Sequence, residues 1–307
     1  MRETEFVEQL RRQFPVHAPV ATGIGDDGAV LTNPDGSQTV VVSDMLLDGV
    51  HFDVAGTRPE LIGRKAIAVN LSDLAAMGCC PTAAFISIAV PGLTQSNRFL
   101  NGLYRGIQSL SERFDFTVAG GDTNSWTGPF AISVSMTGTP FDNRAILRTG
   151  AEPGDSLVVT GALGGSLASQ RHLAFEPRLD VARLLTRNST VHAMIDISDG
   201  LAIDLHRLLK AGDTGALLYL DSVPVHEDVA SGLSREDRLR AALSDGEDFE
   251  LLMAMPAGLV DAAAALVQSE SDSTLTVVGT ITEDSGCRAV DSDGNLSDLH
   301  EIGWQHG

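Results

Sequence analysis

A carboxylate interrupts an otherwise apolar stretch of the chain. Residues 66–78, AIAVNLSDLAAMG, have the composition of a buried helix, yet Asp73 lies among them. An ionised carboxylate among apolar side chains is unfavourable unless it is paired, hydrogen-bonded or bound to a metal ion. Alternatively, Asp73 caps a short helix that begins at Leu74, assisted by Ser72, because these side chains accept hydrogen bonds from free backbone N–H groups. The stretch by itself leaves both interpretations open.

Acidic residues recur where apolar segments give way to loops. A strand-like run at 39–44 ends in Asp44, and the segment 118–124, VAGGDTN, carries Asp122 after another strand. Further acidic residues lie in glycine loops or at a strand-to-helix junction: Asp26, Asp27, Asp196, Asp199, Glu247 and Asp248. Each alone has a local explanation as a turn or a helix cap. Together they indicate a site, because loops at the ends of strands gather functional residues.

These residues offer oxygen ligands without cysteine or histidine partners, a set that suits Mg²⁺ and its usual complement of water and substrate phosphates. Lysine is nearly absent, with only Lys65 and Lys210, and the chain contains no Gly-Lys pair, which excludes a P-loop. Phosphate binding then depends on metal ions, backbone N–H groups or arginine. The pattern indicates phosphoryl transfer assisted by metal ions.

Two other motifs carry weaker signals. The segment 291–298, DSDGNLSD, resembles a calcium loop, but Leu296 occupies the sixth position, where an EF-hand needs glycine. A hairpin turn at Asp293–Gly294 is the better interpretation. The segment 159–169, VTGALGGSLAS, has a glycine turn that is able to hold a phosphate, but a lone glycine turn favours a purely structural role.

Strand-like and helix-like segments alternate along the chain without a repeat. Strands are expected at 39–44, 83–91, 115–122, 130–138, 156–161, 193–198, 215–221, 247–255 and 275–281, and helices at 58–78, 96–114, 200–211 and 257–268. Residues 139–157 combine proline, glycine and charge and predict a domain boundary. We therefore expect an N-terminal α/β domain over 1–145 and a C-terminal α+β domain over 146–307.

Composition narrows the class of protein. The 307 residues are 43% hydrophobic and 20% charged, as expected for folded domains. No apolar run is long enough to span a bilayer, and the N-terminal residues suggest an amphipathic helix with Phe6, Leu10 and Phe14 rather than a signal peptide. The net charge of −20 argues against nucleic acid as a partner. Three cysteines make neither a disulfide framework nor a zinc site, so a cytoplasmic location is expected.

Six motifs follow one another along the chain: GIGDDGAV, SDMLLDGVHF, AVNLSDLAAMG, GGDT, IDISDGL and GEDFEL. This series resembles the thiamine-monophosphate kinase family, within the aminoimidazole ribonucleotide synthetase superfamily. The resemblance implies ATP-dependent phosphorylation of thiamine monophosphate to thiamine diphosphate, with several Mg²⁺ ions. It also implies a homodimer whose N-terminal sheets pair across the two-fold axis.

The same resemblance assigns roles to individual residues, none of them a nucleophile. It implies a metal cluster of Asp27, Ser43, Asp44, Asp73, Asp122, Asp196 and Asp199. It places ATP contacts at Tyr104, Gly121, Asp122, Arg148 and Ser198. It places contacts to thiamine phosphate at His51, Glu247 and Trp304. Asp73 would then bridge metal ions between the two substrates.

The chain departs from the pattern of the family at three places. Val42 stands where relatives often carry a hydroxyl, and Asp245 replaces a glycine that often precedes Gly246 and Glu247. The segment 165–171 is shorter than usual. At Val42 a side-chain contact to a metal ion is lost or becomes a carbonyl contact, whereas the shortened segment touches no metal position.

A mechanism without a protein nucleophile is consistent with the chemistry of the acceptor. A phosphate monoester has a second pKa of about 6, so it is mostly a dianion near neutral pH and needs no general base. We expect direct in-line transfer, with metal ions aligning the two polyanions. The alternatives are another ATP-using member of the superfamily and a non-catalytic nucleotide-binding homologue. A selenophosphate synthetase needs a reactive cysteine near the N-terminus and a hydrogenase-maturation relative a C-terminal cysteine, and the sequence offers neither.

Overall fold

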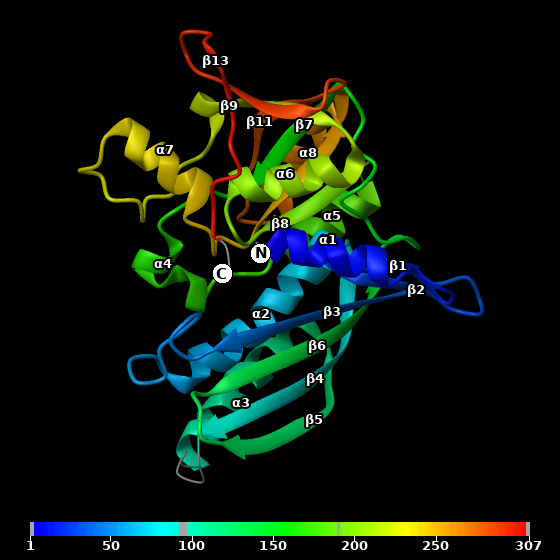
Figure 1. Cartoon of the computed structure of the whole chain (residues 1–307), viewed down its shortest axis with the longest axis vertical. Helices are drawn as coiled ribbons and strands as arrows, with labels where there is room; N and C mark the ends of the chain where they lie inside the picture. Colours follow the sequence, from blue (N-terminus) through cyan, green and yellow to red (C-terminus); the bar gives the residue numbers. More distant parts are fainter. Residues whose placement is uncertain (1–2, 92–96, 189–190, 305–307) are drawn as a thin grey trace.

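The computed structural model describes residues 3–91, 97–188 and 191–304 and consists of two sheet-containing halves. Figure 1 shows the N-terminal sheet below the C-terminal half, with helix α2 between them. None of the helices in the described ranges combines the length and apolar character needed to cross a bilayer.

The N-terminal half is a six-stranded sheet covered by two long helices. Its elements are α1 (Glu3–Gln13), β1 (Val20–Thr22), β2 (Ala29–Thr32), β3 (Gln38–Leu47), α2 (Pro59–Ala76), β4 (Cys79–Pro91), α3 (Asn97–Phe114), β5 (Thr117–Trp126) and β6 (Ala131–Pro140). The strand order is β1-β2-β3-β6-β4-β5, and β4 and β5 are its one parallel pair among the described residues.

The C-terminal half is a seven-stranded, mostly antiparallel sheet with helices around it. Its elements are β7 (Asp155–Thr160), α4 (Ser166–Ser169), η2 (Arg171–Leu173), α5 (Leu179–Asn188), β8 (Ala193–Ile197), α6 (Leu201–Gly212), β9 (Gly215–Tyr219), η3 (Leu220–Ser222), α7 (Arg235–Ser244), β10 (Glu250–Pro256), η4 (Ala257–Leu259), α8 (Val260–Glu270), β11 (Leu275–Thr282), β12 (Gly286–Val290) and β13 (Leu296–Asp298). The strand order is β13-β12-β9-β11-β7-β10-β8.

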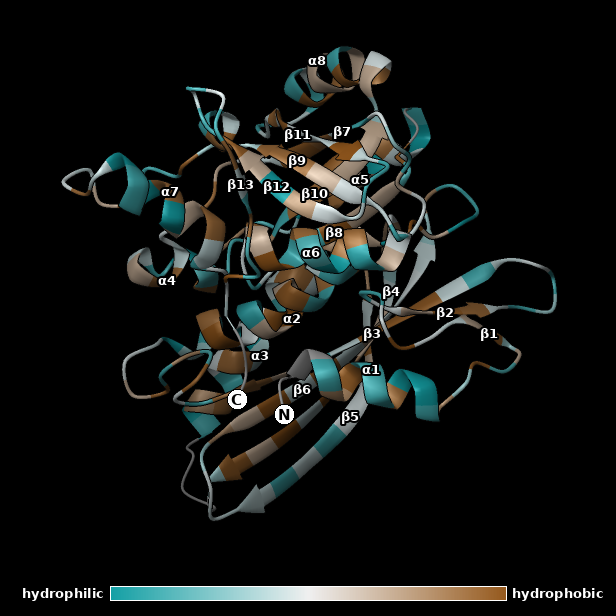
Figure 2. Cartoon of the chain, turned by 45° about the horizontal axis from the view of Figure 1, so that its top comes forward, coloured by the Kyte–Doolittle hydropathy of each residue, from teal (hydrophilic) through white to brown (hydrophobic). Residues whose placement is uncertain are grey.

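Helix α2 belongs to the cores of both halves. It contacts β3, β4 and β6 of its own half, and β8, β10, η2 and α5 of the other half. Leu71 of α2 shares one buried apolar cluster with Met194 of β8 and Met253 of β10. This position explains why α2 is apolar on nearly all sides, as the colouring of Figure 2 reflects. Its side chains therefore reach the junction between the two sheets.

Helices cover only one face of the N-terminal sheet. Along β3, Val40, Val42 and Leu46 are buried, whereas Ser43 and Met45 are exposed on the opposite side. The same alternation runs along β4 and β6, and every residue of β5 is exposed. Successive residues of a strand point to opposite faces, so the parity of a residue on these strands decides whether it faces α2.

The mixed α/β and α+β architecture agrees with the fold class expected from the sequence, and the expected strands and helices are present. The hairpin at Asp293–Gly294 is confirmed by the pairing of β12 with β13. The interpretation of Asp73 as the cap of a helix starting at Leu74 is wrong, because α2 runs through both residues to Ala76.

Three secondary-structure predictions were incomplete. β5 runs through Gly120 and Gly121 and continues past Asp122 to Trp126. The helix α7 was not predicted, because its sequence is mostly polar and has no clear apolar stripe. Its start does carry a signal, since the Ser234 hydroxyl accepts a hydrogen bond from the Asp237 N–H as a helix cap. α5 was also missed. The domain boundary between residues 145 and 146 stays a prediction.

Candidate active site

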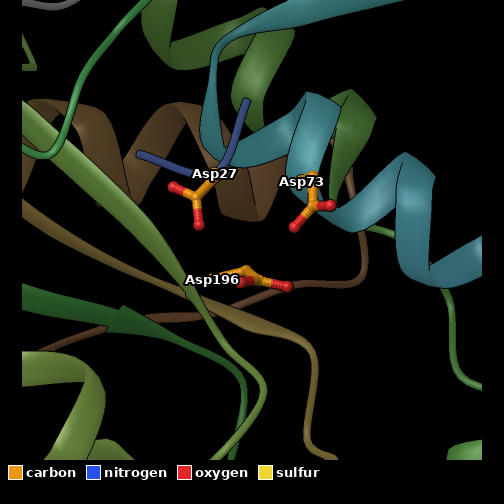
Figure 3. Close-up of side chains that lie close together, drawn as sticks. All are labelled: Asp27, Asp73 and Asp196. Carbon is orange, nitrogen blue, oxygen red and sulfur yellow. The ribbon is translucent and has the colours of Figure 1, made fainter. Parts of the chain in front are cut away.

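Three aspartates from distant parts of the chain converge between the two sheets. Asp27 lies in the loop between β1 and β2, Asp73 in the last turn of α2, and Asp196 in β8. One carboxylate oxygen of each lies within 4.8 Å of the others. Figure 3 shows the three side chains pointing toward one shared space. We call these three residues the aspartate trio.

Asp44 adds a fourth carboxylate to this region because of its parity on β3. It shares the helix-facing side of the strand with Val42 and Leu46 and is hydrogen-bonded to Asp73. Burial raises the pKa of Asp44 to about 6. Burial and then the charges of Asp44, Asp196 and Asp27 raise the pKa of Asp73 well above its ordinary value. The region therefore concentrates negative charge, and a bound cation would reduce the repulsion between the carboxylates.

Two residues already hold members of the aspartate trio in place. The Arg148 guanidinium donates to Asp27 Oδ1 at 2.6 Å, and the Ser72 hydroxyl donates to Asp196 Oδ2 at 2.6 Å. Two buried oxygens, Asp27 Oδ2 and Asp44 Oδ2, have no hydrogen-bond partner among the described residues. Buried polar atoms normally have partners, so these oxygens are free to ligate an ion. An oxygen-only donor set with spare lone pairs fits Mg²⁺.

A second group of predicted site residues surrounds the loop that follows β8. The Glu247 N–H donates to the Ser198 carbonyl at 2.6 Å, and the Trp304 N–H donates to the Asp199 carbonyl at 2.9 Å. Glu247 and Phe249 have positive φ values of 59° and 52°, a backbone conformation that residues other than glycine rarely adopt. Such strain concentrates at functional sites, where the surrounding structure holds it in place.

His51 joins this second group through a residue that the sequence analysis did not assign. Lys65 of α2 donates to the His51 carbonyl at 2.9 Å and forms an ion pair with Glu247. His172 of η2 lies beside both, with its Nδ1 2.8 Å from the lysine Nζ. The only signal for Lys65 was a charged residue in an apolar helix. His172 carried none, because it is 107 positions away in sequence.

Asp199 forms an ion pair with an arginine of the same chain. The Arg207 guanidinium donates to Asp199 Oδ2 at 2.5 Å and to Asp204 Oδ1 at 2.7 Å. Asp204 is fully buried and accepts from the N–H groups of Asp199 and Gly200 at the start of α6. Burial raises the pKa of Asp204 to about 7. Asp204 thus fixes the turn that carries Ser198 and Asp199.

The remaining predicted residues do not join the aspartate trio within this chain. Ser43 lies on the bare face of the N-terminal sheet, opposite Asp44, and its hydroxyl is 2.8 Å from that of Ser135. Asp122 pairs in register with exposed Ser87 and therefore lies on the same bare face. Tyr104 is 39% exposed on the outer side of α3.

Gly121 has a packing reason of its own, since a Cβ there would lie 1.7 Å from the Ile86 carbonyl oxygen. Its presence therefore follows from the close approach of β4 and β5 and needs no ligand to explain it.

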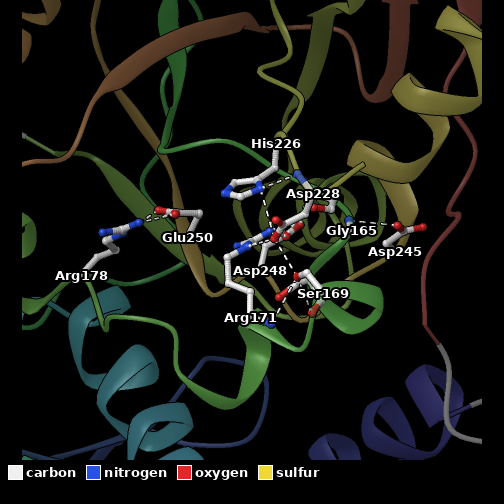
Figure 4. A network of polar contacts seen from close by, with 11 residues as sticks. Gly165, Ser169, Arg171, Arg178, His226, Asp228, Asp245, Asp248 and Glu250 are labelled. Carbon is white, nitrogen blue, oxygen red and sulfur yellow. Dashed lines mark hydrogen bonds and ion pairs between the residues drawn. The ribbon is translucent and has the colours of Figure 1, made fainter. Parts of the chain in front are cut away.

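The glycine turn at 159–169 is occupied by carboxylates of the chain. The Gly164 N–H donates to both oxygens of Asp248, and the Gly165 N–H donates to Asp245 Oδ2 at 3.1 Å. Arg171 adds a hydrogen bond of 3.0 Å to Asp248 (Figure 4). This network holds both ends of the loop that carries Glu247, and it gives Asp245 a structural role.

The fold and the acidic site define the chain as an AIR synthase-related protein. The model of the N-terminal domain of AIR synthase related proteins matches residues 25–139, and the model of their C-terminal domain matches residues 152–292. The thiamine-monophosphate kinase of Rhodopirellula baltica is 37% identical over 317 residues, which cover 99% of this chain and 97% of the relative.

The chain belongs to the thiamine-monophosphate kinase family. A structure of AaThiL complexed with AMPPCP and TMP superimposes with a TM-score of 0.85 at 27% identity, over 100% of this chain and 97% of the other. The thiamine-monophosphate kinase from Stenotrophomonas maltophilia gives a TM-score of 0.75 at 32% identity, over 97% of this chain and 99% of the other. Structures of the hydrogenase maturation protein HypE, at 15% to 18% identity, share the fold.

Proposed function

We propose that this protein transfers the γ-phosphoryl group of ATP to the phosphate of thiamine monophosphate, giving thiamine diphosphate and ADP. The observation that carries the proposal is the meeting of the aspartate trio with the loops of Glu247 and Trp304 around the end of β8. Membership in the thiamine-monophosphate kinase family supports it, as does the likeness to AaThiL, whose structure contains AMPPCP and TMP.

The two substrates are proposed to lie on either side of the aspartate trio. We assign the acceptor to His51, Glu247 and Trp304, which the structure links through Lys65 and Asp199. ATP is assigned to the residues that the family resemblance implies: Tyr104, Gly121, Asp122, Arg148 and Ser198. Arg148 lies beside Asp27 and supplies positive charge on that side of the site.

We propose that Mg²⁺ ions are held by Asp27, Asp44, Asp73 and Asp196. The family also implies Asp199, Ser43 and Asp122, of which Ser43 and Asp122 lie on the opposite face of the sheet in this chain. The unpartnered oxygens of Asp27 and Asp44 support this assignment. When bound, Mg²⁺ supplies charge neutralisation to the phosphates of both substrates.

No residue of the chain needs to act as nucleophile or general base. The acceptor phosphate is mostly a dianion near neutral pH, because its second pKa is about 6. The residues of the chain bind and orient the two phosphates, which is the main catalytic requirement of phosphoryl transfer. We therefore propose direct in-line transfer. Inversion of configuration at a chiral γ-phosphorus is the expected result, and retention contradicts it.

We further propose a homodimer formed through the N-terminal sheet. The bare face of that sheet exposes Met45 and Phe85, of which Met45 is 60% exposed, and β5 leaves an edge open to pairing. The same face carries Ser43 and Asp122. Light scattering tests this assembly, and a monomer at micromolar concentration contradicts it. We place the protein in the cytoplasm, in keeping with its three free cysteines.

The decisive experiment measures ADP release from ATP and Mg²⁺ with three alternative acceptors. Thiamine monophosphate is expected to support turnover, whereas thiamine and aminoimidazole precursors are not. Turnover with an aminoimidazole precursor instead would assign the chain to another branch of the superfamily. ATP binding without acceptor-dependent ADP release would identify a non-catalytic homologue.

A further inference from the structure

Lys65 is a buried cation next to the proposed acceptor site. It lies on α2 with 0% of its side chain exposed, in a chain whose other lysine, Lys210, is 69% exposed. A buried ammonium group is costly unless its donors are satisfied. Its environment therefore has to explain why this lysine is there.

The three donors of the Lys65 ammonium group have three acceptors. They are the His51 carbonyl oxygen at 2.9 Å, His172 Nδ1 at 2.8 Å and Oε2 of Glu247. An ammonium group has three N–H bonds and no acceptor, so these contacts use its full capacity. No donor is left for a substrate phosphate. Lys65 therefore acts on the site through its neighbours.

These neighbours come from both halves of the molecule. His51 and Lys65 belong to the N-terminal half, whereas His172 and Glu247 belong to the C-terminal half. Among the described residues, the polar contacts of the Glu247 carboxylate all go to Oε2. The second oxygen, Oε1, is thus left to receive a donor from a ligand.

The contacts also set the charge of Glu247. Burial opposes ionisation, but the charge of Lys65 and its hydrogen bond to the carboxylate offset it and keep the pKa of Glu247 below its usual value. The neighbouring Arg171–Asp248 pair, also between η2 and the Glu247 loop, restrains the same backbone. Glu247 is therefore held as an oriented anion.

We propose that Lys65 and His172 are positioning residues that fix the Glu247 carboxylate in the geometry that binds the acceptor. The inference rests on the proposed function, since it takes Glu247 to contact thiamine monophosphate. A carboxylate held by Lys65, which His172 in turn keeps in place, presents its free oxygen in one orientation, whereas an unrestrained carboxylate loses that orientation and binds more weakly. The cluster meets the residues assigned to ATP through the backbone hydrogen bond from Glu247 to Ser198, which does not involve the Glu247 carboxylate.

The test compares Lys65→Met with Lys210→Met, which removes the same charge from the surface. Steady-state kinetics with each substrate varied separately should show the KM for thiamine monophosphate at least tenfold higher in Lys65→Met. The KM for ATP should change less than twofold, and Lys210→Met should match the wild type in both. A purely structural lysine would lower the melting temperature and leave the ratio of the two KM values unchanged, which overturns the inference.

Two further variants keep the test decisive if Lys65→Met does not fold. The double variant Lys65→Met/Glu247→Gln leaves no unpaired buried charge and is compared with Glu247→Gln alone. If Lys65 acts through Glu247, the two have KM values for thiamine monophosphate within twofold of each other. A further tenfold rise in the double variant overturns the inference. His172→Leu retains the Lys65–Glu247 pair and should raise that KM at least threefold, and an unchanged KM removes His172 from the proposal.

The outcome for the wild type separates this inference from the proposed function. Absence of ADP release with thiamine monophosphate in the wild type refutes the function. Normal turnover in the wild type with unaltered KM values in Lys65→Met refutes only the positioning role.

Discussion

Replacing Asp73 by asparagine should stabilise the metal-free protein while destroying its activity. The carboxylate oxygens of the aspartate trio lie within 4.8 Å of one another, so each charged pair repels by about 3.5 kcal/mol at an effective dielectric constant of about 20. Asparagine keeps the volume and removes the repulsion of Asp73 with both Asp27 and Asp196. Its amide group also remains able to donate to Asp44, which is hydrogen-bonded to Asp73.

The size of this gain depends on pH in a defined direction. Burial, followed by neighbouring charges, raises the pKa of Asp73 in the folded protein well above its ordinary value. The folded state therefore binds more protons than the unfolded state between the two pKa values, and the wild type loses stability as pH rises through that range. The loss is at most about 1.4 kcal/mol per pH unit for one group. The substituted asparagine does not titrate, so the advantage of the variant grows with pH.

Denaturant unfolding in the presence of a chelator measures this effect. The Asp73→Asn variant should be within about 1 kcal/mol of the wild type at pH 5 and at least about 2 kcal/mol more stable at pH 8. Asp272→Asn, at an exposed loop position, should change stability by less than about 0.5 kcal/mol at either pH. With Mg²⁺ present, the Asp73 variant should lose at least roughly 100-fold in kcat, because an amide is a poor bridging ligand. A variant less stable than the wild type at both pH values would show that the carboxylate stabilises the fold, which refutes the reasoning.

Three further results are expected. Ser72→Ala removes the hydroxyl that donates to Asp196 and should lower kcat about tenfold with little change in either KM, and an unchanged kcat would show that Asp196 needs no such partner. Trp304→Ala should raise the KM for thiamine monophosphate about tenfold, the scale of a lost cation–π contact of ~1.5–2 kcal/mol, with little effect on the KM for ATP. Because Trp304 is 48% exposed, the melting temperature of this variant should fall little, and a large fall with an unchanged KM would make Trp304 a packing anchor instead. In thermal-shift assays, a non-hydrolysable ATP analogue should stabilise the protein far more with Mg²⁺ than without it, and equal shifts would contradict a metal bridge to the nucleotide.

The sequence singled out Asp73 and Asp196, two of the three aspartates that the structure brings together, because their signal was local. Asp73 and Asp196 each interrupt or end an apolar run, and such residues need a compensating partner wherever the chain folds. The parity of the strands was also readable: Asp44 shares the buried alternation of Val42 and Leu46, whereas Ser43 does not. Applied consistently, that alternation predicts that Ser43 and Asp44 face opposite sides of the sheet.

The cluster around Lys65 was not predictable in the same way. Its partners Glu247 and His172 are 182 and 107 positions distant and meet it only because α2 packs against the C-terminal half. A sequence pattern reports the periodicity within one element, but it does not report which elements meet. The carboxylates of Asp248 and Asp245 fill the glycine turn for the same reason, and no local feature announces that pairing.

The burial of α2 between two sheets has a consequence for cooperativity and motion. Since one helix packs against both sheets, separating the halves would expose apolar residues on both sides of α2, although the C-terminal half also has a buried cluster of its own. Heat should unfold the whole chain in a single transition, with equal calorimetric and van't Hoff enthalpies. A hinge rotation of one half against the other would disrupt this shared packing. Large rigid-body closures normally leave such buried packing intact. Any enclosure of substrates must then come from loops outside this shared packing, while the aspartate trio and the restrained Glu247 loop stay in place.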